Sequence, residues 1–255
     1  MEDAPTAQRE NPTRHRRRRP RRTCALLLAL AALAVATPAG QAAERYDRAF
    51  NWSGYRWTVR STTQGANPGH NRWGDSRTNA RVRSDKSLAV NIAAGRSVEV
   101  VGPSTGYGTY RWVVATDLST IDAFRVAAFF VYGMGGEQDV EFARWGDASF
   151  ATAGSWVTWR RQTRVGFGFF AVSAAAPYAI DIDWRIGASR FTMRDASGAT
   201  LLERTFSSSA PARRAAPHIS YWVYPGDGKN RSPFTAASIH PPIVVESFQY
   251  QPMRH

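Results

Sequence analysis

The chain has 255 residues, 43% of them hydrophobic and 12% aromatic, with 9 Trp and a single Cys. Its formal net charge is +13, but no block of basic residues interleaved with aromatics marks a groove for nucleic acid, so we expect no nucleic-acid partner. One cysteine cannot form an intramolecular disulfide, so the fold must be held by burial of a core, for which the chain is long enough.

Residues 1–43 have the composition of a signal peptide. A basic run, Arg16–Arg22, is followed by an apolar stretch, Cys24–Ala36, and then by small residues in "ATPAGQAAE". This order is typical of secretory signals, and thirteen apolar residues are too few to span a membrane. We therefore expect a signal peptide over 1–43, no stable membrane anchor, and a domain over 44–255 that is secreted to the extracellular or periplasmic space.

After residue 44 the pattern is that of an all-β protein. Short runs rich in Val, Ile, Phe, Tyr and Trp recur between Gly, Pro, Asn and Ser, and no helix of ten or more residues is predicted. "RDASGAT" predicts a hairpin turn. The spacing favours one antiparallel sandwich or barrel. Strands are predicted at 53–61, 78–84, 87–93, 97–102, 108–118, 124–133, 137–146, 163–173, 178–186, 189–198, 200–206, 218–226 and 243–252.

The run "EQDVEF" places three acids, Glu137, Asp139 and Glu141, at alternate positions. On a strand these side chains share one face. Two glutamates leaning together can bring their carboxyl groups to about 5–6 Å, the separation used by retaining glycosidases. Crowding then separates the pKa values, so that one carboxyl keeps a proton while its neighbour stays ionised. The pattern therefore favours glycoside chemistry.

Two other interpretations of the triplet stay open. Three carboxylates could bind a cation such as calcium, although cation ligands usually come from turns. The acids could also form a solvated strand face. Among other polar residues, His70, His218 and His240 are interpreted as isolated loop histidines, without the spacing of metal ligands. Asp181 and Asp183 alternate with apolar residues, which predicts a half-exposed strand without chemistry.

The run 137–142 resembles the E-[ILV]-D-[IV]-E-F active-site strand of glycoside hydrolase family 16, the laminarinase, lichenase and β-agarase group. Further segments are similar to other parts of that family. "NRWGDSRTNARVRSDKSLAVNI" resembles its opening strands, "YAIDIDWRIGASRFTMRDASG" a central strand pair, and "ISYWVYPGDG" with "VVESFQYQP" its closing strands. The resemblance covers nearly all of residues 44–255, and the acidic triplet is its most specific part.

The resemblance implies a jelly-roll β-sandwich of two curved antiparallel sheets with a concave carbohydrate-binding cleft. It implies that Glu137 is the nucleophile, Asp139 its electrostatic helper and Glu141 the acid/base of a retaining, endo-acting glycoside hydrolase. A β-linked polysaccharide, either β-glucan or galactan, is the implied substrate, and we expect a monomer. No cofactor and no catalytic metal are expected. A structural calcium occurs in parts of the family, but no Asp-rich loop here indicates one.

Aromatic side chains are expected to bind sugar rings by stacking. The candidates lie in or beside the proposed cleft segments: Trp145, Trp73, Trp222 and Tyr221. The chain departs from the family at Gln138, which replaces an apolar residue, and at Tyr221, which replaces the usual Asn. Two alternatives to a hydrolase remain, a lectin-like carbohydrate-binding protein and a transglycosylase. Retention of all three acids favours an enzyme over a lectin.

Overall fold

The structure is a computed structural model of the whole chain, and it describes residues 43–150, 154–172, 176–207, 210–224 and 241–253. Of the chain's two units, Met1–Ala31 and Ala32–His255, all these residues belong to the second. The expected signal peptide, apart from Ala43, and His240 lie outside the described residues. In the described part of the chain, no helix has the length and hydropathy needed to cross a membrane.

The described residues form fifteen strands and one turn of 3-10 helix. In chain order they are β1 (Glu44–Trp52), β2 (Tyr55–Thr62), β3 (Ala80–Val82), β4 (Leu88–Val90), β5 (Val98–Val101), β6 (Gly108–Val114), η1 (Leu118–Thr120), β7 (Arg125–Gly133), β8 (Gly136–Ala143), β9 (Gly154–Arg160), β10 (Thr163–Phe170), β11 (Tyr178–Arg185), β12 (Ala188–Arg194), β13 (Thr200–Phe206), β14 (Ala216–Val223) and β15 (Ile243–Pro252).

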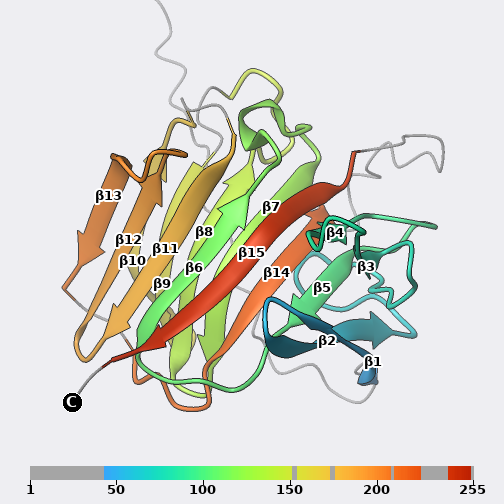
Figure 1. Ribbon diagram of the computed structural model, residues 1–255, viewed down its shortest axis with the longest axis horizontal. Helices are drawn as coiled ribbons and strands as arrows, with labels where there is room; N and C mark the ends of the chain where they lie inside the picture. The colour runs from blue at the N-terminus through green and yellow to red at the C-terminus, as the bar shows by residue number, and fades with distance from the viewer. Residues whose placement is uncertain (1–42, 151–153, 173–175, 208–209, 225–240, 254–255) are drawn as a thin grey trace, which may run out of the picture. The chain divides into compact units, whose positions relative to one another are not determined.

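The strands form two antiparallel sheets packed face to face. The eight-stranded sheet has the order β1-β2-β5-β14-β7-β8-β9-β10, and the seven-stranded sheet has the order β13-β12-β11-β6-β15-β4-β3. Figure 1 shows the seven-stranded sheet in front, with β15 crossing the view, and the eight-stranded sheet behind it. The predicted all-β, jelly-roll-like sandwich is confirmed.

Aromatic side chains from both sheets fill the space between them. Trp112 of β6 contacts Phe129 of β7 with ring centroids 6.1 Å apart. Trp156 of β9 contacts Phe191 of β12 at 5.6 Å. Burial of each such ring contributes about 1.5–3 kcal/mol. This core determines which face of each strand is left for function, because alternate residues must point outward.

Most predicted strands are present, and the 189–206 hairpin is confirmed as β12 paired with β13. Two strands were not predicted. The sequence pattern did not indicate β1, or β9, which forms from "GSWVTWR" and pairs with the acidic strand. The omission of β9 matters most, because β9 supplies side chains to the site.

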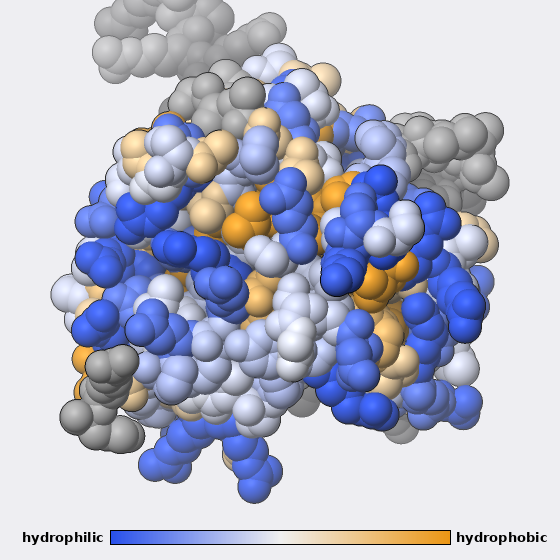
Figure 2. All heavy atoms as spheres, viewed as in Figure 1, coloured by the Kyte–Doolittle hydropathy of each residue, from blue (hydrophilic) through white to orange (hydrophobic). Residues whose placement is uncertain are grey.

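The outer face of the seven-stranded sheet carries paired charges. Asp181 accepts two hydrogen bonds from Arg111, at 2.6 and 2.7 Å, and a third from Arg194 at 3.1 Å. Asp183 is bonded by Arg185 and Arg190. Both aspartates are buried, so the prediction of a half-exposed strand without chemistry is wrong about their exposure. Figure 2 shows this face, over which hydrophilic residues predominate.

Candidate active site

The three acids lie on β8, which pairs with β7 and β9 inside the eight-stranded sheet, and all point outward. Gln138, Val140 and Phe142 are fully buried on the opposite, inner face. Asp139 is 6% exposed, while Glu137 and Glu141 are half-buried. The shared face predicted from the alternation is therefore confirmed. The three side chains are brought together by one strand, without help from a loop.

Strands β7 and β9 pair with β8 on its two sides and supply the immediate neighbours of each acid. Glu137 lies between Tyr132 and Trp159, Asp139 between Phe130 and Val157, and Glu141 between Ala128 and Ser155. Trp159 donates a side-chain hydrogen bond to Asp139. Because residues opposite each other in a sheet point to the same face, these six side chains surround the triplet.

A close approach of backbone fixes the start of the acidic strand. A Cβ added to Gly136 would lie 2.1 Å from the carbonyl oxygen of Trp159 and 2.5 Å from Cβ of Ala210. Only glycine fits there, at a φ of 157°. The residue before Glu137 therefore determines how tightly β8 packs on β9, and so where the acids lie relative to Trp159.

Burial raises the pKa values of all three acids, and the charges of neighbouring acids add to the rise for Asp139 and Glu141. The pKa of Glu141 rises to about 8, first because of burial and then because of the charge of Glu137. Burial and the charges of both glutamates raise the pKa of Asp139 well above its usual range. Burial also raises the pKa of Glu137, but its hydrogen bond with Asp139 and the nearby His218 oppose that rise. These shifts favour a state in which Asp139 and Glu141 are protonated and Glu137 is ionised.

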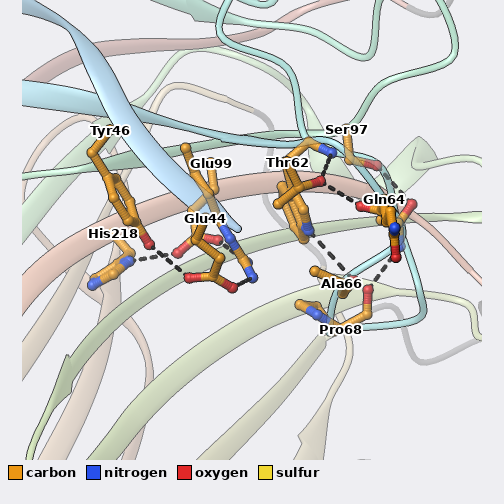
Figure 3. Close-up of polar contacts among 12 residues, drawn as sticks. Glu44, Tyr46, Thr62, Gln64, Ala66, Pro68, Ser97, Glu99 and His218 are labelled. Atoms are coloured by element: carbon orange, nitrogen blue, oxygen red, sulfur yellow. Dashed lines mark hydrogen bonds and ion pairs between the residues drawn. The ribbon is translucent and has the colours of Figure 1, made fainter. Parts of the chain in front are cut away.

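An ion-paired cluster lies on the same face, beside β7. Arg60 of β2 bonds Glu99 of β5 at 2.7 Å and also bonds Glu44 of β1. Glu99 in turn is 2.7 Å from Nδ1 of His218 on β14. Figure 3 shows these contacts. His218 is 7% exposed and belongs to a strand, so its interpretation as an isolated loop histidine is wrong. His70 does lie in an exposed loop.

Aromatic residues cluster at the other end of the triplet, next to Ala143. Trp73 and Trp222 are buried there, and Trp145 and Tyr224 pack against them half-buried. Asn71 holds the loop in place: its side chain bonds the backbone of Val223 at 3.0 and 3.3 Å. The three predicted sugar-binding tryptophans therefore lie together, on the same side of the sheet as the acids.

The predicted substrate-binding residues differ in how much of each side chain is exposed to solvent. Trp145 keeps solvent-accessible surface, and Trp222 is 6% exposed. Trp73 is fully buried and lies under the guanidinium of Arg60, 4.6 Å from its ring centre, so it supports the cluster and leaves no face for a sugar. Tyr221 packs in the core between the sheets. The expectation that Tyr221 contacts substrate is wrong, because neighbours on a strand point to opposite faces and Trp222 points outward.

Two hollows lie away from the acids. One, of about 400 Å³, lies beside Trp73 and Arg96. The other, of about 820 Å³, lies among the turns around Met134, Arg161 and Arg213. Among the described residues, no group of three or more His, Cys, Asp or Glu has an arrangement that could hold a metal ion.

Sequence reasoning missed the residues that surround the triplet. Trp159 and Ser155 lie on the unpredicted strand β9, and the alternation of Ser155, Val157 and Trp159 was the signal that could have found them. His218 and Glu99 lie on strands that were predicted, but only the sheet order brings them together. No local pattern in the sequence indicates that pairing.

No protein-family model and no curated protein matches the sequence. Solved structures do match. The β-glucanase of Bacillus licheniformis gives a TM-score of 0.60 at 15% identity, covering 85% of this chain and 100% of its own. A glycoside hydrolase family 16 endo-glucanase from Bacteroides ovatus gives 0.56 at 10% identity, covering 76% and 94%. An immunostimulatory antigen and pseudo β-1,3-glucanase of Mycobacterium tuberculosis gives 0.57 at 14% identity, covering 78% and 91%.

At these identities the similarity shows the fold. The chain has the jelly-roll sandwich of the family 16 β-glucanases, as its resemblance at the acidic strand implied. Because the same fold also occurs in a protein described as a pseudo-glucanase, activity has to be argued from the side chains of the site.

Proposed function

We propose that the protein is an endo-acting glycoside hydrolase that cleaves a β-linked polysaccharide, β-glucan or galactan, with retention of anomeric configuration. The observation that carries the proposal is the outward-facing triplet of Glu137, Asp139 and Glu141 on β8, whose neighbours give its carboxyl groups different proton affinities. The glucanase-like fold supports the substrate class.

Each acid has a role in this proposal. Glu141, with a pKa of about 8, carries the proton that a departing sugar oxygen needs. Glu137, which forms a hydrogen bond with Asp139, is the carboxylate that attacks the anomeric carbon. Asp139, itself protonated, keeps that carboxylate ionised by donating a hydrogen bond to Glu137. After the leaving group departs, Glu141 deprotonates the water that releases the sugar from Glu137.

Chemical rescue of two variants by azide tests the roles of the glutamates. In Glu137→Ala, azide replaces the nucleophile and attacks an activated β-glycoside once, which gives an α-glycosyl azide. In Glu141→Ala, the covalent intermediate still forms if the leaving group needs no proton, and azide then gives a β-glycosyl azide. Opposite anomers from the two variants support the assignment. The same anomer from both contradicts it, and exchanged anomers reverse the roles.

A non-catalytic carbohydrate-binding protein is the second candidate, and one comparison favours it: a pseudo β-1,3-glucanase shares the fold at similar identity. A panel of polysaccharides assayed for new reducing ends separates the candidates. Hydrolysis by wild type, lost in Glu137→Ala, supports the enzyme. Binding of glycan by wild type and both variants with equal affinity, without cleavage by any of them, supports the binding protein.

We also propose that catalysis needs no metal, because the carboxyl groups supply both the proton and the nucleophile. Activity should therefore survive treatment with EDTA. Complete loss that calcium reverses would instead favour the cation-site interpretation of the triplet.

A further inference from the structure

The cluster of Arg60, Glu99 and His218 lies beside the triplet, and the proposed mechanism does not use it. Arg60 and Glu99 are buried and bonded to each other at 2.7 Å. Glu44, whose side chain is 43% exposed, bonds the other end of the guanidinium and accepts a hydrogen bond from Tyr46. The cluster therefore has two carboxylates against one guanidinium, and a proton on His218 makes it neutral.

The contacts of His218 fix the orientation of its ring. Nδ1 faces a carboxylate oxygen of Glu99 at 2.7 Å. One face of the ring stacks on Phe130, with centroids 4.5 Å apart, and Tyr132 approaches edge-on at 6.2 Å. Burial alone would raise the pKa of Glu99, but its bonds to His218 and Arg60 outweigh that effect and lower it. Glu99 is thus held as an anion that favours an imidazolium beside it.

The sheet places this ring one strand away from the acids. His218 pairs with Phe130, and Phe130 pairs with Asp139 on the far side of β7. Glu137 pairs with Tyr132, the ring that covers the edge of His218. Two strand spacings separate β14 from β8, about 10 Å between Cα atoms. In a partly buried site, a unit charge at that distance changes a pKa by roughly one unit.

We propose that His218, held by Glu99, is a positioning residue that keeps Glu137 ionised by placing an imidazolium one strand away from it. The description of Glu137 as a nucleophile rests on the proposed function, whereas the electrostatic coupling rests on the contacts alone. Glu99 lies on the far side of His218 from β8, so the positive end of the pair faces the triplet. The favourable effect of His218 on the ionisation of Glu137 accordingly exceeds the opposing effect of Glu99.

The charged and titratable groups around His218 come from five strands. They are Glu44 and Tyr46 on β1, Arg60 on β2, Glu99 on β5, Tyr132 on β7, and Glu137 and Asp139 on β8. Tyr132 stays neutral, because burial and three nearby glutamates raise its pKa. The cation nearest to Glu137 in this set is therefore a protonated His218, since Arg60 lies beyond Glu99.

The first measurement follows both titrations in the wild-type protein. Nitrogen-15 spectra of the histidines in the full-length wild-type protein give the protonation state of His218 at each pH, and carbon-13 spectra of labelled glutamate carboxyls give that of Glu137. The Glu137 signal is identified by its absence in Glu137→Gln. We expect His218 to be protonated over the pH range in which Glu137 titrates. A neutral His218 throughout that range overturns the proposal.

Two variants separate charge from structure. In His218→Asn the amide nitrogen takes the place of Nδ1 and keeps the bond to Glu99, but the positive charge is lost. The apparent pKa of Glu137 should rise by about half a unit to one unit. In the double variant His218→Asn with Glu99→Gln, the opposing negative charge is removed too, and the pKa should return toward the wild-type value. His70→Asn, in an exposed loop, should leave it unchanged.

If His218 has a purely structural role, the apparent pKa of Glu137 should differ more from wild type in the double variant than in the single variant. That result, or no shift in His218→Asn, contradicts the proposal. If the protein is active, the acidic limb of kcat/KM should move to higher pH by the same amount while KM stays within about threefold. If it cleaves no polysaccharide yet the Glu137 titration shifts as expected, the proposed function fails and the coupling stands.

Discussion

Glu137 and Glu141 are identical residues on the same face of β8, and individual neighbouring side chains give them different pKa values. Asp139 and His218 oppose the rise in the pKa of Glu137, whereas burial and the charge of Glu137 raise the pKa of Glu141 to about 8. The hydroxyl of Ser155, opposite Glu141, moderates that rise. The asymmetry that acid/base chemistry requires thus comes from Asp139 within the triplet and from side chains on the neighbouring strands.

Replacing Asp139 by Asn tests the helper role. The amide can still donate to Glu137, but it is a weaker donor than a protonated carboxyl, so it opposes the rise in the pKa of Glu137 less. We expect KM within about threefold of wild type, kcat lowered by at least about tenfold, and the acidic limb of kcat/KM moved to higher pH. Because the triplet titrates as a coupled set, the limbs belong to the set.

Asp195→Asn, in the exposed turn between β12 and β13, serves as the matched control. It should reproduce the wild-type profile. If Asp139→Asn also follows wild type at every pH, Asp139 has no helper role.

At the scale of single residues, the alternation of side chains along a strand allowed the sequence to predict which residues share a face. It placed Glu137, Asp139 and Glu141 on one face, and the structure agrees. It also assigned both Tyr221 and Trp222 to the substrate, which a strand does not allow, since only one of two neighbours can face outward. Which of the two faces the core depends on pairing with β5 and β7, and that information is not local.

The acidic strand has an inner face as well, and Gln138 is its unusual member. Gln138 is fully buried, and its Oε1 accepts a hydrogen bond from Thr158 Oγ1 at 2.9 Å, while its Nε2 has no hydrogen-bond partner in the described structure. A buried donor without a partner costs about 1–3 kcal/mol. The strand that carries the catalytic candidates is therefore less stable than an apolar inner face would make it.

A double substitution tests this cost. Gln138→Met together with Thr158→Val keeps the volumes similar and removes both polar partners. Urea unfolding followed by circular dichroism should show a free energy of unfolding higher by about 1 kcal/mol. Thr158→Val alone leaves both ends of the Gln138 amide unpaired and should lower it. A double variant less stable than wild type would show that Nε2 of Gln138 has a hydrogen-bond partner in the folded protein.

Among the elements, "GSWVTWR" escaped prediction because its pattern is short and mixed, with three apolar residues among Gly, Ser, Thr and Arg. It becomes a strand because its backbone pairs with β8 on one side and β10 on the other. The longer and more apolar β7 and β11 were identifiable by composition alone. Long-range pairing, and not local propensity, therefore completes the site.

For the molecule as a whole, export is a prediction from residues 1–43. A basic run, a short apolar stretch and small residues predict cleavage by a signal peptidase. Expressed from the full chain in a secreting host, the extracellular protein should begin between residues 37 and 44, as peptide mass mapping of its N-terminus would show. An extracellular form that retains Arg16–Arg22 contradicts cleavage.

The fold and the site make separate contributions to function. The two sheets bury the large aromatic residues, and this burial supplies stability without any disulfide. The same sandwich is found in a β-glucanase and in a pseudo-glucanase. Stability of the framework allows the outer face of β8 to hold three acids whose burial is unfavourable, and the cost of that site should be measurable in the whole molecule.

Glu141 provides that measurement through the pH dependence of stability. Its pKa is about 8 in the folded protein, against about 4.3 in an unfolded chain. Below the unfolded value both states are protonated and the group costs nothing. As the pH rises toward 8, the folded state must either hold a proton that the unfolded state has released or bury a charge, so wild-type stability falls through this window and levels off above it.

Glu141→Gln removes the titration while keeping the shape of the side chain. Allowing for partial exposure, the variant should be more stable than wild type by about 1–3 kcal/mol near pH 8, and the difference should vanish near pH 4. Urea unfolding at a series of pH values measures it. Glu203→Gln, on the exposed part of β13, should follow wild type throughout. A constant difference between Glu141→Gln and wild type at every pH would mean that packing, and not a raised pKa, sets the cost of this carboxyl.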